Sequence, residues 1–202
     1  MQKKSETYSN FYEFKALVEK ESGKQVKALR SDNGGEFISG EFKDFCNVEG
    51  VQRELIAPHN PQQNRVAGRK NRTNMGAARA MLHDQGLPLH LWAKACNTAV
   101  YVQNRCPHKI LGMSTLKEVF SGKRPDISHL RIFGSPVYIH VTKDARKKLE
   151  PTAEVGIFVG YTDMPHNYCV YFPDSRKNVV RQDIKFHEEK SMKCLLEREP
   201  HL

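Results

Sequence analysis

The chain has 202 residues, of which 39% are hydrophobic, so it is long enough to bury a core as one domain or as one domain with a small appendage. Its 32 Lys and Arg residues outnumber its 23 Asp and Glu residues, and the formal charge of +9 favours a polyanionic partner, although solubilising surface charge explains it equally well. No apolar run reaches the ~20 residues that cross a bilayer, and residues 1–10 lack the apolar segment of a secretory signal. We therefore expect an intracellular protein, nuclear or cytoplasmic, that is neither secreted nor embedded in a membrane.

The cysteines and histidines support neither a disulfide framework nor a zinc site. The five cysteines are odd in number and scattered, and no two of them form a C-x-x-C pair. The nine histidines are also dispersed. We expect reduced thiols, in keeping with an intracellular compartment.

The first part of the chain alternates helix and strand patterns. Apolar residues at helical spacing predict an amphipathic helix over residues 11–22, which Gly23 ends; they are Phe11, Phe14, Leu17 and Val18. Short strands are expected in "KQVKALRSD" and "VQRELIAP", with a short helix around Phe42, Phe45 and Cys46 between them. The first strand ends at Asp32, before the turn-forming "NGG".

A long helix is expected from Asn64 to about Gln85. One broad sector of this helix is apolar and contains Val66, Ala67, Ala77, Ala78, Met81 and Leu82. Its opposite side carries four arginines, Arg65, Arg69, Arg72 and Arg79. Gly68 also lies in this helix, where glycine costs about 1 kcal/mol relative to alanine.

Two further helices and a β-rich part follow. Pro88 suits the first turn of a helix that reaches about Arg105, with an apolar stripe of Leu89, Trp92, Ala93, Cys96, Ala99 and Val100. Another short helix is expected around Thr115 to Phe120. The polar "SGKRPD" is the best candidate for a linker in the chain. The short β-type runs after it predict a small β-domain, for which a barrel is one possible architecture. The predicted division is therefore residues 1–120, a linker at 121–126, a β-domain at 127–188 and an unstructured tail at 189–202.

Four features offer chemistry, each with a plain structural alternative. Asp32 could bind a hard cation such as Mg²⁺ at the end of its strand, but an Asx-type turn is the favoured interpretation of a lone D-N-G-G. The four arginines could lie along a phosphate backbone or form a solvated helix face, and both remain open. "KDARKK", Lys143 to Lys148, is either a second basic patch or an exposed hairpin. Core packing is favoured over base stacking for the aromatic residues Trp92, Phe133, Tyr138, Tyr161, Tyr168 and Tyr171.

Ordered motifs along the chain carry a resemblance to a known family. They include "LRSDNGGEF", "PQQN", "RKNRT", "LRIFG", "IFVGY" and "DIKFHE". From about Phe11 to Glu188 the sequence resembles the integrase region of copia-type LTR retrotransposon Pol polyproteins, in the retroviral integrase superfamily. The resemblance implies an α/β fold class: a partial ribonuclease-H-like integrase core that lacks its first strands, a helical extension, and then a small all-β, barrel-like domain.

The resemblance also implies a metal site that this chain has lost. In that family two Asp residues and a Glu hold two Mg²⁺ ions for DNA cleavage and strand transfer. Asp32 matches the second Asp and is the remaining catalytic and metal-binding carboxylate. Counting on through residues 33–67, the family spacing, brings the position of the catalytic Glu to Gly68, while Arg65 stands where the family has Gly. The family's first Asp lies upstream of where this chain begins, so we expect no productive Mg²⁺ binding and no activity from this chain alone.

DNA contacts are expected to survive this loss. The expected DNA-binding residues are Arg65, Arg69, Lys70, Arg72 and Arg79, and the expected partners are DNA, as element ends or without sequence preference, and other integrase chains. Two alternatives remain open: a host-retained, non-catalytic DNA-binding module, and a decayed element with no function. An enzymatic role survives only if a partner chain supplies the missing strand and carboxylates.

Overall fold

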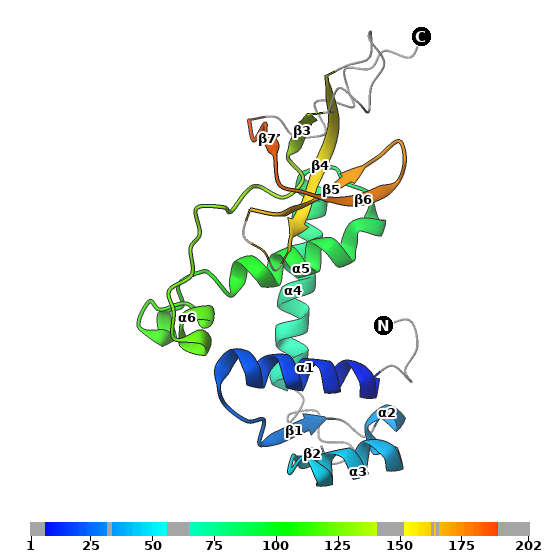
Figure 1. Cartoon of the computed structure of the whole chain (residues 1–202), viewed down its shortest axis with the longest axis vertical. Coiled ribbons are helices and arrows are strands. Elements are labelled where there is room, and N and C mark those ends of the chain that lie inside the picture. The colour runs from blue at the N-terminus through cyan, green and yellow to red at the C-terminus, as the bar shows by residue number, and fades with distance from the viewer. Residues whose placement is uncertain are drawn as a thin grey trace. The chain divides into compact units, whose positions relative to one another are not determined.

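The computed structural model (Figure 1) describes residues 7–31, 34–55, 65–140, 152–162, 164 and 166–189, without the side chains of Glu36, Arg65 and Val66. The chain forms two compact units, residues 1–71 and 72–202. The predicted linker, residues 121–126, lies within the second unit, and the predicted domain limits stay a prediction. Within the described ranges, no helix combines the length and the apolar character that crossing a membrane requires.

The first unit combines helices with a two-stranded sheet. Its elements are α1 (Thr7–Ser22), β1 (Ala28–Ser31), α2 (Gly35–Ile38), α3 (Gly40–Val48) and β2 (Gln52–Leu55). Strands β1 and β2 pair in parallel, from Ala28 opposite Gln52 to Ser31 opposite Leu55. The predicted helices and strands of this part are confirmed, with α1 beginning at Thr7. Gly23 closes α1 with a φ of +65°, a conformation that glycine adopts without steric cost.

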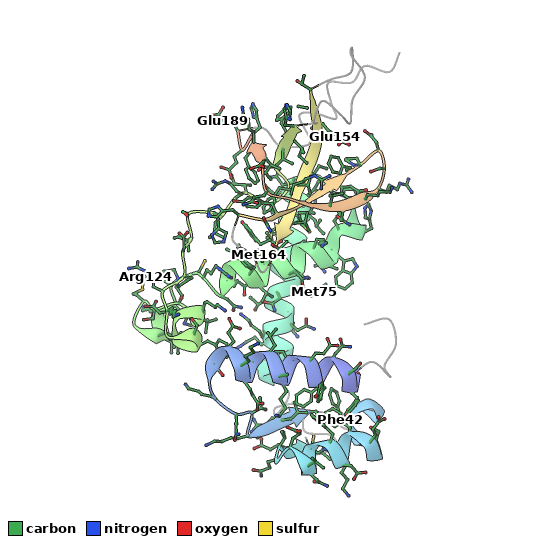
Figure 2. All side chains as sticks on the ribbon, viewed as in Figure 1. Phe42, Met75, Arg124, Glu154, Met164 and Glu189 are labelled. Carbon is green, nitrogen blue, oxygen red and sulfur yellow. The ribbon has the colours of Figure 1, made fainter. Side chains whose placement is uncertain are left out.

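Aromatic side chains make the core of the first unit. Phe42 of α3, labelled in Figure 2, is fully buried together with Cys46, and Phe45 and Val51 lie beside them. Tyr8 and Phe11 of α1 pack on this cluster, with the Tyr8 ring edge-on to Phe45 at 5.3 Å between centroids. The predicted apolar face of α1 is only partly covered, because Phe14 and Leu17 are 57% and 64% exposed.

The second unit is built on a five-stranded antiparallel sheet with the order β6-β5-β4-β3-β7 (Figure 1). Its strands are β3 (Pro136–His140), β4 (Ala153–Tyr161), β5 (Tyr168–Phe172), β6 (Lys177–Arg181) and β7 (Ile184–Phe186). Its helical elements are η2 (Leu89–Leu91), α5 (Trp92–Gln103), η3 (Lys109–Leu111) and α6 (Leu116–Ser121). The described strand pairs do not join β6 to β7, so a closed barrel stays a prediction. The predicted third helix is confirmed as α6, which Thr115 and Glu118 cap reciprocally.

Helix α4 (Arg65–Asp84) confirms the predicted long helix and runs from the first unit into the second. Within the second unit, Ala78 and Leu82 of α4 pack with Leu91 and Ala95 against one face of the sheet. The residues that meet them from the sheet side are Phe133, Ile157, Val159, Cys169 and Tyr171. The other face holds a second core of Val137, Ile139, Phe158, Tyr168, Val170 and Phe172. From Gly156 to Gly160, strand β4 is therefore buried on both faces.

The buried side of α5 corrects part of the predicted apolar stripe. Leu89 and Trp92 were expected on the core face, but they are 78% and 55% exposed. The side that meets the sheet carries Ala99, as predicted, together with Leu91 of η2 and with Ala95 and Thr98 of α5, which the predicted stripe did not include. Small side chains stand there because the helix lies close to the sheet, and the bulky tryptophan does not fit such a contact. Core packing is confirmed for Phe133, Tyr168 and Tyr171, which are buried, whereas Trp92 is the aromatic residue that this prediction placed wrongly.

Candidate nucleic-acid interface

Helix α4 presents a basic face. The side chains of Arg69, Lys70, Arg72 and Arg79 are exposed. At about 100° per residue, the four arginine positions of the helix, Arg65 included, fall within a sector of about 80°. Asp84, in the last turn, is the only acidic residue in the sequence of this helix. Positive charge along α4 is therefore not balanced from within the helix.

The arginines of this face differ in their surroundings. Arg69 and Lys70 each have an interaction partner in the structure. No described group forms a hydrogen bond or an ion pair with the side chain of Arg72 or Arg79. Their guanidinium groups carry five donors each in a planar fork that matches phosphate oxygens. Arg72 and Arg79 are thus the members of the face most available to a ligand.

Gly68 lies on α4 with no structural need for glycine. It is exposed, and among the described residues no heavy atom other than those of its chain neighbours and of the surrounding helix backbone lies within 4 Å of the position that a Cβ would occupy. Its φ is not in the left-handed region, so any L-residue is compatible with this backbone. A glutamate side chain would fit at this position, so packing does not explain the glycine.

The predicted metal site is not supplied by the described residues. Gly68 offers no oxygen ligand, and in the described part of the chain no three His, Cys, Asp or Glu side chains gather as metal ligands. Asp32 lies outside the described residues, as do Lys143 to Lys148 and Cys194. Two Mg²⁺ ions held about 3.5–4 Å apart need several carboxylates to offset their repulsion. The described residues do not provide the set of carboxylates that a pair of Mg²⁺ ions requires.

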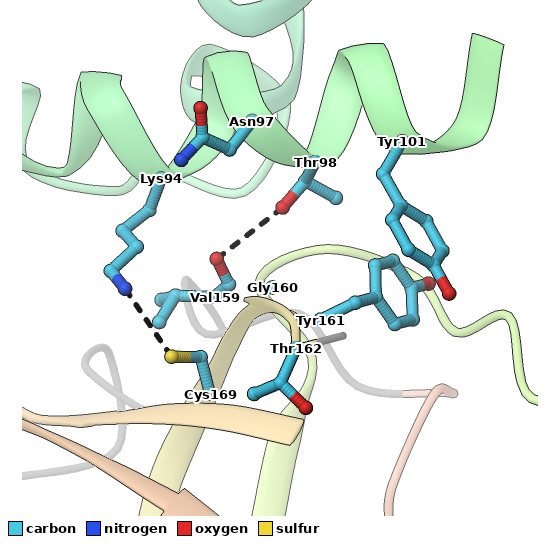
Figure 3. Close-up of a pocket in the computed structure, with 9 residues that line it drawn as sticks. All are labelled: Lys94, Asn97, Thr98, Tyr101, Val159, Gly160, Tyr161, Thr162 and Cys169. Carbon is cyan, nitrogen blue, oxygen red and sulfur yellow. Dashed lines mark hydrogen bonds between the residues drawn. The ribbon is translucent and has the colours of Figure 1, made fainter. Parts of the chain in front are cut away.

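A polar cavity in the second unit was not foreseen from the sequence. It has a volume of about 240 Å³ and lies between α5 and the ends of β4 and β5 (Figure 3). Lys94 and Thr98 of α5 face Gly160 and Cys169 across it. These residues are some 60 to 75 positions apart along the chain, and no local pattern links them. The polar Lys94 and Asn97, one helical turn apart in a largely apolar helix, were the available signal.

An aromatic cluster borders this cavity. Tyr101 stacks on Tyr161 at 4.4 Å between ring centroids, and the Tyr101 hydroxyl lies 2.8 Å from Nε2 of His129. Burial raises the pKa of Tyr161 to about 12, although its hydrogen bond with the Arg131 backbone acts in the opposite direction. Burial, and then the nearby Arg105 guanidinium, lowers the pKa of His129. Tyr161 is therefore uncharged near neutral pH, and His129 resists protonation.

Comparison with known proteins relates the chain to transposon polyproteins. Residues 135–199 match the family described as "Retroviral polymerase SH3-like domain". Over 185 residues the chain is 39% identical to the retrovirus-related Pol polyprotein from transposon TNT 1-94 of Nicotiana tabacum, a match that covers 92% of this chain and 14% of the relative. The corresponding proteins from transposons RE2 and RE1 of Arabidopsis thaliana are 30% and 28% identical over 189 residues, covering 93% of this chain and 13% of each relative.

Among solved structures, the cryo-EM structure of the simian T-cell lymphotropic virus intasome in complex with PP2A regulatory subunit B56 gamma matches with a TM-score of 0.49 and 15% sequence identity. The match covers 89% of this chain and 62% of that chain. A TM-score below 0.5 does not establish a shared fold. The sequence matches confirm that the chain resembles retrotransposon Pol polyproteins. The chain, which spans about a seventh of its curated relatives, is a homologue of the retrovirus-related Pol polyproteins of plant transposons and carries a retroviral polymerase SH3-like domain.

Proposed function

We propose that the chain is an integrase-derived segment of a copia-type Pol polyprotein that binds DNA through the basic face of α4 and does not catalyse strand transfer by itself. The observation that carries the proposal is the exposed arginine face of α4 around Gly68. The first unit, with its parallel β1–β2 pair followed by α4, is proposed to be the remainder of a ribonuclease-H-like core. We propose in addition that the chain associates with other integrase chains and that it is located in the nucleus or the cytoplasm.

The α4 face suits the DNA backbone because its charges are spaced along one line. A rise of about 1.5 Å per residue separates Arg72 from Arg79 by roughly 10 Å along the helix axis. Duplex DNA carries one negative charge per ~1.7 Å of its axis, so both arginines can meet phosphates at once. The formal charge of +9 adds a long-range attraction for a polyanion.

The absence of catalysis follows from chemistry at position 68. A hydrogen atom cannot coordinate a metal ion, and the general role of the missing glutamate is to complete a set of carboxylates around two Mg²⁺ ions. Replacing a carboxylate by glycine also removes a negative charge from the basic face. The same substitution that ends metal binding therefore strengthens the attraction between α4 and phosphate.

Fluorescence anisotropy with a labelled 20-base-pair duplex tests DNA binding. We expect affinity to fall steeply between about 50 and 200 mM salt, and the log–log slope to decrease in magnitude by about one for each of Arg72→Ala and Arg79→Ala. Arg124→Ala is the matched control, since Arg124 is an exposed arginine in the segment after α6 (Figure 2) and not on α4. Equal effects of all three substitutions, or an affinity that does not respond to salt, would contradict the proposal.

A strand-transfer assay with Mg²⁺ tests the predicted inactivity. The unmodified chain, Gly68→Glu, and Gly68→Glu joined to the upstream segment of the TNT 1-94 relative are compared. We expect product only from the last protein, because it alone restores all three carboxylates. Product from the unmodified chain would show that the loss at Gly68 does not abolish catalysis.

A further inference from the structure

The cavity between α5 and the sheet has fixed walls. Thr98 Oγ1 donates a hydrogen bond of 3.4 Å to the Val159 carbonyl, which ties α5 to β4. At Gly160 the register of β4 against β5 shifts, and φ is +149°. A Cβ at Gly160 would lie 2.9 Å from Thr98 Oγ1, so glycine permits this close approach. The cavity is thus shaped by the fold before any ligand arrives.

The aromatic end of the cavity is also fixed, and it is not open to stacking. One face of Tyr101 meets Tyr161, and the guanidinium of Arg105 lies 3.3 Å from the centroid of the Tyr101 ring. The Tyr161 hydroxyl donates to the Arg131 carbonyl at 3.0 Å. Because the Tyr101 ring is already covered by Tyr161 and Arg105, a nucleobase cannot be sandwiched against it.

The charge inside the cavity is unbalanced. Lys94 reaches from α5 toward Cys169, with 3.3 Å between Nζ and Sγ (Figure 3). A thiol is a weak acceptor and carries no formal charge, so it does not neutralise an ammonium group. No Asp or Glu is among the described residues that line the cavity. Asn97, which lies one helical turn after Lys94, adds an amide at the same rim.

We propose that this cavity binds a phosphate group, with Lys94 as its cationic anchor and Asn97 as a hydrogen-bond donor. A phosphate monoester carries a charge of about −1.5 to −2 near pH 7 and three strong acceptor oxygens, which complements an unpaired ammonium beside an amide. A volume of about 240 Å³ lies below the usual range for a whole drug-sized ligand, roughly 300–1,000 Å³, so the sugar and base of a nucleotide stay outside. This site does not depend on the α4 face.

Two sources supply such a group: free inorganic phosphate, and the terminal phosphate of a nucleic acid strand. Isothermal titration calorimetry measures binding directly and needs no reporter group in the cavity. Titration with sodium phosphate at constant ionic strength is expected to give a saturable change. A trinucleotide with a 5′-phosphate is expected to bind more tightly than the same trinucleotide with a 5′-hydroxyl if a strand end is the natural occupant. Equal binding of the two trinucleotides, with saturation by phosphate retained, would assign the site to free phosphate.

Lys94→Met keeps the length of the side chain and removes its charge, and we expect it to weaken phosphate binding by about tenfold or more. Lys123→Met, at an exposed lysine of the same unit that does not line the cavity, should leave binding unchanged. If Lys94→Met fails to fold, Asn97→Ala at an exposed position provides the second measurement, with a smaller loss.

The double variant Arg72→Ala/Arg79→Ala should retain phosphate binding in the cavity even if it loses duplex DNA, so the two proposals fail separately. Absence of saturable binding by phosphate and by both trinucleotides, or equal losses in Lys94→Met and Lys123→Met, would overturn the inference.

Discussion

The two units of the chain hold their strands in different ways. In the first unit a single parallel pair, β1 and β2, is backed by one small aromatic core around Phe42. In the second unit the central strand β4 has a hydrogen-bonded neighbour on each side and buried residues on both faces. Parallel strands usually occur in larger sheets covered on both faces. The comparison predicts that the second unit contains most of the chain's stability.

The largest expected effect tests this difference directly. Phe158 of β4 is fully buried, with Tyr161, Tyr168 and Phe186 edge-on around it at 5.1 to 5.7 Å between centroids. Phe158→Ala should cost about 3–5 kcal/mol in the free energy of unfolding of the second unit. Urea unfolding followed by NMR signals of each unit measures it.

The matched change in the first unit is Phe42→Ala, which is equally buried. We expect it to unfold the first unit while the signals of the second persist. Simultaneous loss of both units in either variant would mean that they unfold as one, and the comparison would then be wrong.

The next effect concerns close packing in β4. A Cβ at Gly156 would lie 2.3 Å from Cγ1 of Val170, so Gly156→Ala should destabilise the second unit by about 1–3 kcal/mol. Gly76→Ala on α4 is the control, because nothing lies within 4 Å of a Cβ there. We expect opposite signs for the two variants in a thermal unfolding experiment. A neutral Gly156→Ala would show that the sheet opens easily at this point.

The stability of the second unit should depend on pH through His129. The pKa of His129 is lowered in the folded chain, first by burial and then by Arg105, so the unfolded chain binds this proton more readily. Stability from His129 is therefore complete above the unfolded pKa, about 6.5, and is lost as the pH falls below it. Urea midpoints at pH 7.5 and 5.5 should differ for the wild type and differ less for His129→Gln.

His83→Gln, at an exposed histidine, is the control for this pH effect and should keep the wild-type difference. Asp126, whose pKa is lowered first by the Ser128 backbone N–H and then by the Ser128 hydroxyl, acts only at lower pH, below its unfolded pKa of about 3.9. A pH response that is the same in His129→Gln and in the wild type would assign it to another group.

The smallest expected effect is on the stability of helix α4, which contributes residues to both units. Gly68→Ala should stabilise α4 by up to about 1 kcal/mol, since the site is exposed and open. Thermal unfolding measures the gain, and DNA affinity should not change because no charge is altered. A loss of stability would mean that the backbone at Gly68 needs glycine for a reason that its surroundings do not show.

Sequence patterns predicted those elements whose signals are local. The helical spacing around Phe42 and the spacing from Asn64 to Gln85 led to α3 and α4, and the short helix expected around Thr115 to Phe120 is α6. The basic face of α4 follows from the same periodicity, because residues three and four apart share a side of any helix. Local backbone preference and the periodic spacing of apolar residues can be recognised without knowing which distant segment packs against the helix.

The orientation of α5 and the cavity beside it depend on what lies opposite. Trp92 and Ala95 both belong to an apolar helix, and only the approach of the sheet decides that the smaller side chain is buried. The juxtaposition of Lys94 with Cys169, 75 positions along the chain, arises from the register of β4 and β5. The sequence by itself determined the elements and the basic face of α4, with Gly68 within that helix. The tertiary structure decided which faces are covered and where a charge is left unpaired, since burial and charge balance are set by contacts between distant segments.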